Sequence, residues 1–338
     1  MQHPLAARRQ AQPTGVIETL SAGYAAVNRH LWVLLLPILV DVFLWVGPHV
    51  SYSPLVDPTV TRAAEWARQV TLGPRRAQRA NPELVNVDDV RLWLIAQTGE
   101  LNVLTVVARG PLAPPSLATI PSIRGDLSFV SDWRAAVGLV VACLSAGMLL
   151  GGAFYRGLAI ASSGRGTGLV AEGRRTGRDV VRVLGLLATL LGVGVLLGLP
   201  VLVLVTATVF VAPVVAALGV LLVFGGLLFV LLHLFFAVDA IFVSNVGPLN
   251  AIQRSVAVVR RHPWSSVALM LLTWLILAGM AQVWAVLASN LQSPYGTALS
   301  ILGNAYIASG LVAAGMIFYL ERADAVPSPG PVVALSSN

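Results

Sequence analysis

Hydrophobic positions along this chain gather into six apolar runs. They cover residues 31–46, 135–155, 183–208, 212–236, 265–288 and 297–320. A helix needs about 20 apolar residues to cross the hydrocarbon core of a bilayer, so all but the first run are long enough. The first helix therefore has to begin a turn earlier. The pattern predicts an all-α, polytopic membrane bundle of six transmembrane helices.

A shorter segment, residues 247–264, has the period of an amphipathic helix that leads into the fifth run. Its apolar positions recur at spacings of three, four and three and share one helical face: Leu249, Ile252, Val256 and Val259. Arg254, Arg260 and Arg261 lie on other faces, and His262 followed by Pro263 ends the helix. An apolar stripe beside arginines is typical of a helix in the headgroup layer. These arginines are our candidate lipid contacts; the alternative is a helix packed only on neighbouring loops.

The same segment recurs near the start of the chain. Shifted by 232 residues, it overlays residues 15–32, with identities at Gly15, Ala25, Val27, Arg29, His30 and Trp32. A third copy is expected around residues 169–182, where only the arginine-rich entry is clear. We interpret the chain as three units, each a cytoplasmic lead-in helix followed by a transmembrane hairpin. Such repeats occur in transporters, although a duplicated hairpin can also be purely structural.

Polar segments set the expected boundaries. They give a disordered tail at 1–14, a surface helix and first span at 15–47, an extracytoplasmic segment at 48–133, a five-span bundle at 134–322 and a disordered tail at 323–338. Arginines concentrate before the first span and in the loops 156–182 and 239–262, whereas the long segment balances to zero. By the positive-inside rule, both termini are predicted to be cytoplasmic.

Composition narrows the class of protein. Hydrophobic residues make up 57% and charged residues only 11%, against about a quarter charged in soluble domains. All 22 basic residues are arginines, and the net charge of +7 follows the loops, so we expect no nucleic-acid partner. The single cysteine, Cys143, permits no intrachain disulfide and no zinc cluster. We expect no cofactor.

One resemblance to known proteins is visible. The run FVSNVGPLNAIQRSVAVVRRHPWSSVALMLL, within residues 235–272, resembles a segment that recurs in a loose group of six-helix bacterial membrane proteins. That group includes the membrane domain attached to some glycerophosphodiester phosphodiesterases. Ala251 and Ser255 carry the shared small-residue face, and residues 154–175 resemble the group's other cytoplasmic loop. The resemblance implies a multi-pass protein of a bacterial cell membrane but transfers no enzymatic residue, because the soluble phosphodiesterase domain is absent.

Few residues suggest chemistry. Asp41 lies near the middle of the first span, where an ionisable group costs about 2.5–3.5 kcal/mol on insertion scales, so we expect it to be buried with a partner such as Gln282 or Asn304. A role for Asp41 in proton or ion coupling is the functional alternative. His233, inside the fourth span, is expected to be a hydrogen-bonded core residue.

These candidates form no catalytic or metal-binding constellation. We therefore expect a non-enzymatic integral membrane protein with a transport or membrane-organising role, whose partner is membrane lipid, including anionic headgroups. The alternative is a membrane enzyme that acts on lipid at the bilayer interface. A transporter should carry polar residues at mid-depth in several spans, whereas a lipid enzyme should cluster acids, histidines or serines at one face.

Overall fold

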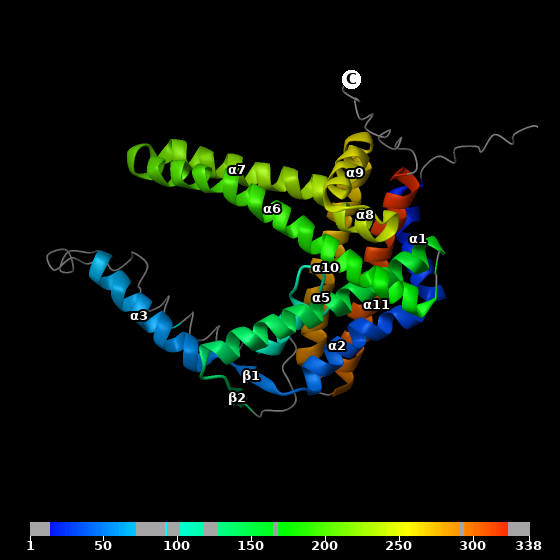
Figure 1. Ribbon diagram of the computed structural model, residues 1–338, viewed down its shortest axis with the longest axis horizontal. Helices are drawn as coiled ribbons and strands as arrows, with labels where there is room; N and C mark the ends of the chain where they lie inside the picture. Colours follow the sequence, from blue (N-terminus) through cyan, green and yellow to red (C-terminus); the bar gives the residue numbers. More distant parts are fainter. Residues whose placement is uncertain are drawn as a thin grey trace, which may run out of the picture. The chain divides into compact units, whose positions relative to one another are not determined.

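The computed structural model describes residues 14–71, 92, 102–117, 127–164, 166, 168–290 and 294–323. Its helices are α1 (Val16–Arg29), the 3-10 helix η1 (Leu31–Leu34), α2 (Leu35–Val46), α3 (Ser53–Thr71), the 3-10 helix η2 (Val103–Ala108), α5 (Trp133–Ser163), α6 (Leu169–Val211), α7 (Pro213–Leu234), α8 (Ala237–Ser244), α9 (Pro248–Arg261), α10 (Pro263–Asn290) and α11 (Pro294–Ala323) (Figure 1). Two short parallel strands, β1 (His49–Ser51) and β2 (Leu127–Phe129), pair residue for residue.

The prediction of an all-α polytopic bundle is confirmed. Among the described residues, five helical stretches are long and apolar enough to cross a membrane. The sharply bent pair of Val16–Arg29 and Leu31–Val46 counts as a sixth if it is one span. The chain is therefore a multi-pass integral membrane protein.

The chain divides into two compact units. The first comprises Met1–Leu34, Tyr155–Val283 and Tyr306–Asn338, and the second comprises Leu35–Phe154 and Trp284–Ala305. In the first unit, α6 and α7 run side by side as a hairpin (Figure 1). We expected a lead-in helix separate from the third span, but α6 joins the two without a break and continues through Pro200.

Part of the segment between the first two spans packs against membrane helices. Within the second unit, the backbone of Val107 lies against Gly147 of α5, and the backbone of Leu112 lies against Gly151. A side chain at either glycine would collide with those carbonyl groups. We expected this glycine pair to admit another helix, and it admits irregular chain instead. Residues 103–117 therefore reach the middle of α5, and the segment 48–133 is not wholly outside the membrane helices.

A buried asparagine fixes the start of this inserted stretch. The Asn102 side chain accepts hydrogen bonds from the backbone N–H groups of Val50 and Leu104, both at 3.1 Å, and donates to the Pro48 carbonyl at 3.2 Å. It thus joins β1 to η2. The expected surface position of residues 90–107 lies mostly outside the described residues, as do the disordered tails. Thr14, at the edge of the first tail, donates to Glu321 at 2.7 Å.

Candidate functional site

The first and second copies of the repeated segment have the same local structure. Both α1 and α9 are 14-residue helices. Their N-caps, Gly15 and Gly247, have φ/ψ of −63°/163° and −75°/168°, and their C-caps, His30 and His262, have −135°/53° and −130°/57°. Such agreement at both ends shows that the repeat found in the sequence is also a structural repeat. The first turns of α6 join the series when their N-cap, Gly168, is aligned with Gly15 and Gly247.

The three lead-in helices also bury the same face. In α1 the buried positions include Thr19, Gly23, Ala26 and Val27, and in α9 the equivalent positions are Ala251, Ser255, Val258 and Val259. In α6 these positions hold Glu172, Thr176, Asp179 and Val180, of which the last two are buried. The first two copies thus present small or apolar residues to the protein, whereas the third presents two carboxylates.

Each buried face packs on a membrane helix of the first unit. Gly23 lets α1 approach the backbone of α11 at Gly310 and Ala314, where a Cβ would collide. The Ser255 hydroxyl of α9 donates to the His233 carbonyl at 2.6 Å and accepts from the Phe236 N–H at 3.1 Å. The small-residue face of α9 is therefore a close helix contact.

The apolar stripe predicted for α9 does not act as one surface. Val259 is fully buried in the protein, Ile252 and Val256 are half-buried, and Leu249 is 64% exposed. The stripe is divided because the small side chains of Ala251 and Ser255, beside it on the helix, set the direction of packing. The candidate lipid contacts Arg260 and Arg261 are exposed, and Arg254 is half-buried.

Exposed residues recur in the same register. The third residue of each repeat is a large aliphatic that faces away from the protein: Ile17 is 78% exposed, Val170 77% and Leu249 64%. The position 12 residues later is arginine in all three copies, at Arg29, Arg182 and Arg261. Trp32 and Trp264, which follow the breaks after α1 and α9, are also exposed. Each lead-in helix therefore combines an exposed aliphatic with a terminal arginine.

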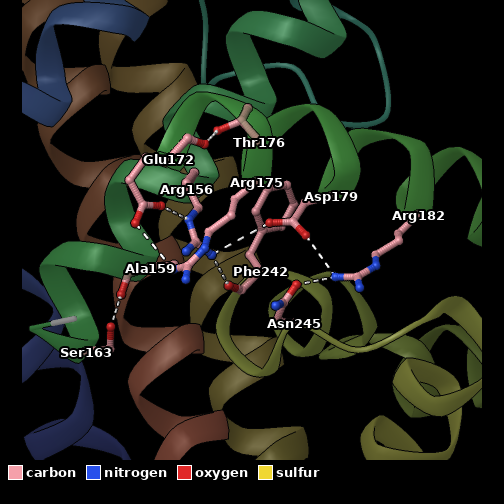
Figure 2. A network of polar contacts seen from close by, with 10 residues as sticks. All are labelled: Arg156, Ala159, Ser163, Glu172, Arg175, Thr176, Asp179, Arg182, Phe242 and Asn245. Atoms are coloured by element: carbon pink, nitrogen blue, oxygen red, sulfur yellow. Dashed lines mark hydrogen bonds and ion pairs between the residues drawn. The ribbon is translucent and has the colours of Figure 1, made fainter. Parts of the chain in front are cut away.

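The acidic face of α6 is held by an arginine from α5 (Figure 2). Arg156 Nε donates to Glu172 at 2.5 Å, and its Nη1 donates to the Phe242 carbonyl at 3.0 Å and lies 3.6 Å from Asp179. Arg182 Nη1 lies 3.1 Å from Asp179. The side chains of Arg156 and Asp179 are 10% and 0% exposed, so this is a buried ion network. Removal of one partner from such a network is far more costly than its net contribution to stability.

A small cavity of about 130 Å³ adjoins this network. Its walls include Arg156 and Arg175, with Ser163 at the end of α5 and Asn245 after α8. Asn245 has φ 55°, a left-handed conformation that asparagine tolerates at a helix C-terminus. Neither carboxylate of the network lines the cavity, so its polar lining is cationic and neutral.

An arginine-lined groove lies on the outer side of α6. Arg174, Arg175 and Arg178 line it together with Val170. Arg174 and Arg178 are exposed, and Arg175, one third exposed, also contacts Glu172 at 3.4 Å. Arg175 thus lies between the groove and the cavity. Positive charge exceeds negative charge in this part of the first unit.

Asp41 occupies a separate site in the second unit. It is 1% exposed, as expected for an ionisable group within a span. Its partners come from the inserted stretch: the Ser116 hydroxyl donates to Oδ1, and the Leu117 N–H donates to Oδ1 at 3.0 Å and Oδ2 at 3.2 Å. These are not the Gln282 and Asn304 that we expected.

The remaining candidates are scattered. Gln282 is exposed, and its predicted burial is wrong because it lies in a stretch of α10 where Ala281 and Val283 are exposed as well. Asn304 is half-buried. His233 is also half-buried, and its Nδ1 lies 2.8 Å from the Phe229 carbonyl of its own helix.

Two further observations complete the electrostatics of the described residues. No group of three or more histidine, cysteine or acidic side chains there could hold a metal ion. Burial, followed by the charges of Arg322 and Arg261, lowers the pKa of His262, so the C-cap of α9 is neutral at neutral pH.

Sequence reasoning missed the network around Arg156, although one signal was available. Glu172, Thr176 and Asp179 follow at spacings of four and three, which puts them on one face of a helix. That face is the one buried in the other two copies. The arginine that it faces lies on a different helix and could not be identified from spacing.

Comparison with known proteins places the chain in a family. No curated protein and no solved structure matches it. A family model described as a domain of unknown function, DUF7847, matches residues 68–332, which is more than half of the chain. The chain therefore belongs to the DUF7847 family.

Proposed function

We propose that this protein is a non-enzymatic, membrane-organising protein whose three lead-in helices lie in the cytoplasmic headgroup layer and bind anionic lipid. The observation that carries the proposal is the recurrence of an exposed aliphatic at one register position: Ile17, Val170 and Leu249. A lone exposed leucine needs no explanation, but three equivalents on helices that end in arginine fit a common apolar environment. The headgroup layer accepts such a face and attracts basic residues by about 1 kcal/mol each.

The rival of a lipid enzyme is less well supported by the same site. Acids do cluster at one end of α6, but Glu172 and Asp179 both lie against arginines. A general base must be within reach of a substrate proton and hold a suitable pKa. Carboxylates that are paired in this way and lie outside the adjoining cavity serve to position arginines.

Lipid contact can be tested with fluorophores at single cysteines. In a cysteine-free background, Leu249→Cys, Ile17→Cys and, as a control on an exposed polar position of α9, Gln253→Cys are labelled with an environment-sensitive dye. We expect dyes at 249 and 17 to be quenched by lipids that carry a quencher near the headgroup, and more strongly in anionic bilayers. The dye at 253 should be quenched less. Equal quenching at all three positions would contradict the proposal.

Transport is a second candidate, favoured by the inserted stretch. Non-helical chain at membrane depth is tolerated where it is buried in protein or lines a cavity, and transporters place broken segments of this kind at their binding sites. Here residues 103–117 meet the buried carboxylate of Asp41. If Asp41 carries a proton or cation, Asp41→Asn should fold normally and abolish uptake or growth complementation.

A further inference from the structure

The geometry points to a phosphate-binding site in the cavity formed by Arg156, Arg175, Ser163 and Asn245. This inference deepens the proposed function, because a phosphate there would belong either to a lipid headgroup or to a free phosphate compound. Both sources share the chemistry that the cavity walls offer, namely planar guanidinium donors with neutral donors beside them.

Arg156 has hydrogen-bonding capacity left for a ligand. Its Nε is used by Glu172, and its Nη1 by the Phe242 carbonyl and Asp179. Within the described residues no hydrogen bond or ion pair uses Nη2. The two carboxylates and the carbonyl fix the plane of the guanidinium group, so little conformational entropy remains to be lost when an oxyanion binds.

The other walls supply donors without a competing negative charge. Asn245 accepts a hydrogen bond from Arg182 through its side-chain oxygen, which assigns that atom as the acceptor and leaves the amide NH₂ group as a donor. Arg175 is one third exposed and lines both this cavity and the arginine groove outside it. A phosphate could therefore be attracted by Arg174 and Arg178 at the groove and then held by Arg156 and Arg175.

The size of the cavity suits a small oxyanion rather than a large ligand. Its volume of about 130 Å³ compares with the roughly 30 Å³ that one water molecule occupies in the liquid. A phosphate group fits this space, while the rest of a lipid would have to remain outside, on the surface that α6 shares with the groove. The cavity would thus recognise the phosphate alone.

The test uses the full chain in nanodiscs of neutral lipid. One arm titrates inorganic phosphate and glycerol phosphate by calorimetry, and the other measures retention of phosphatidylglycerol against phosphatidylcholine by native mass spectrometry. Arg175→Gln removes a cavity donor, and Arg178→Gln removes the same charge from the groove only. Asn245→Gly keeps the left-handed backbone and removes another cavity donor.

We expect saturable binding in at least one arm, weakened about tenfold by Arg175→Gln, since hydrogen bonds to charged groups contribute about 1.5–3 kcal/mol. Asn245→Gly should also weaken it, and Arg178→Gln should change it by less than about twofold. Binding in the first arm identifies free phosphate as the source, and binding only in the second identifies a headgroup. Absence of saturable binding, or equal losses in Arg175→Gln and Arg178→Gln, overturns the inference. Quenching at positions 17 and 249 reports on the lead-in helices separately, so failure of the cavity and failure of the proposed function are distinguishable.

Discussion

Asp41 acts as a latch for the inserted stretch, and its loss should release that stretch from α2 and α5. The carboxylate accepts from the Ser116 hydroxyl and the Leu117 N–H. Asp41→Leu removes both acceptors and leaves two donors without a partner in a buried place. Asp41→Asn keeps one side-chain oxygen that can accept from both donors.

The expected magnitudes follow from these contacts. A buried donor left without a partner costs about 1–3 kcal/mol in soluble proteins, while polar pairs measured within membranes average about 0.6 kcal/mol. Two orphaned donors therefore place Asp41→Leu at a loss of roughly 2–4 kcal/mol. Asp41→Asn should lose less than about 1 kcal/mol, and Ser116→Ala about 1 kcal/mol. The effects of Asp41→Leu and Ser116→Ala should not add, because the two residues share one hydrogen bond.

Cys143 provides an assay that reads the latch itself. This buried residue packs in a cluster with Val107 of the inserted stretch and Val40 of α2. Release of the stretch should expose the thiol, so a membrane-permeant maleimide should react faster in Asp41→Leu than in Asp41→Asn or the unaltered protein. Thermal unfolding in detergent measures the accompanying loss of stability. If Asp41→Leu changes neither the reaction rate nor the unfolding temperature, Asp41 does not hold the stretch and the reasoning fails.

Three further predictions concern other parts of the molecule. Arg156→Met should destabilise the protein by about 3–5 kcal/mol in detergent unfolding, because it leaves buried carboxylates uncompensated; a change below about 1 kcal/mol would contradict the buried network. Gly147→Ala should destabilise strongly, since its Cβ meets a backbone carbonyl, whereas Gly138→Ala on the same helix has open space and should gain up to about 1 kcal/mol. In a cysteine-free background, an impermeant thiol reagent applied to intact cells should label Ala63→Cys and spare Ala171→Cys, and the reverse pattern would invert the topology.

The fold could be predicted from the sequence where periodicity and length carry the information. Apolar runs gave the spans, and the identity of Gly15–Arg29 with Gly247–Arg261 at matched positions gave a repeat whose caps then proved to have the same backbone geometry. The partner of Asp41 could not be predicted, because it lies 75 residues away in a stretch without helical or strand period. Nothing in local spacing links such a stretch to a particular helix.

The third copy shows why a repeat helps to locate a site. In α1 and α9 the shared face holds residues such as Gly23 and Ser255, which need no charged partner. In α6 the same register holds Glu172 and Asp179, and Arg156 compensates them. Apolar residues in place of a buried ion network would be about as stabilising, or more so, and the other two copies demonstrate that this register accepts them. Stability therefore does not explain the charges in the third copy. What they do achieve is to hold one guanidinium group in a fixed plane at the wall of a cavity, which is the arrangement that recognition of an oxyanion requires.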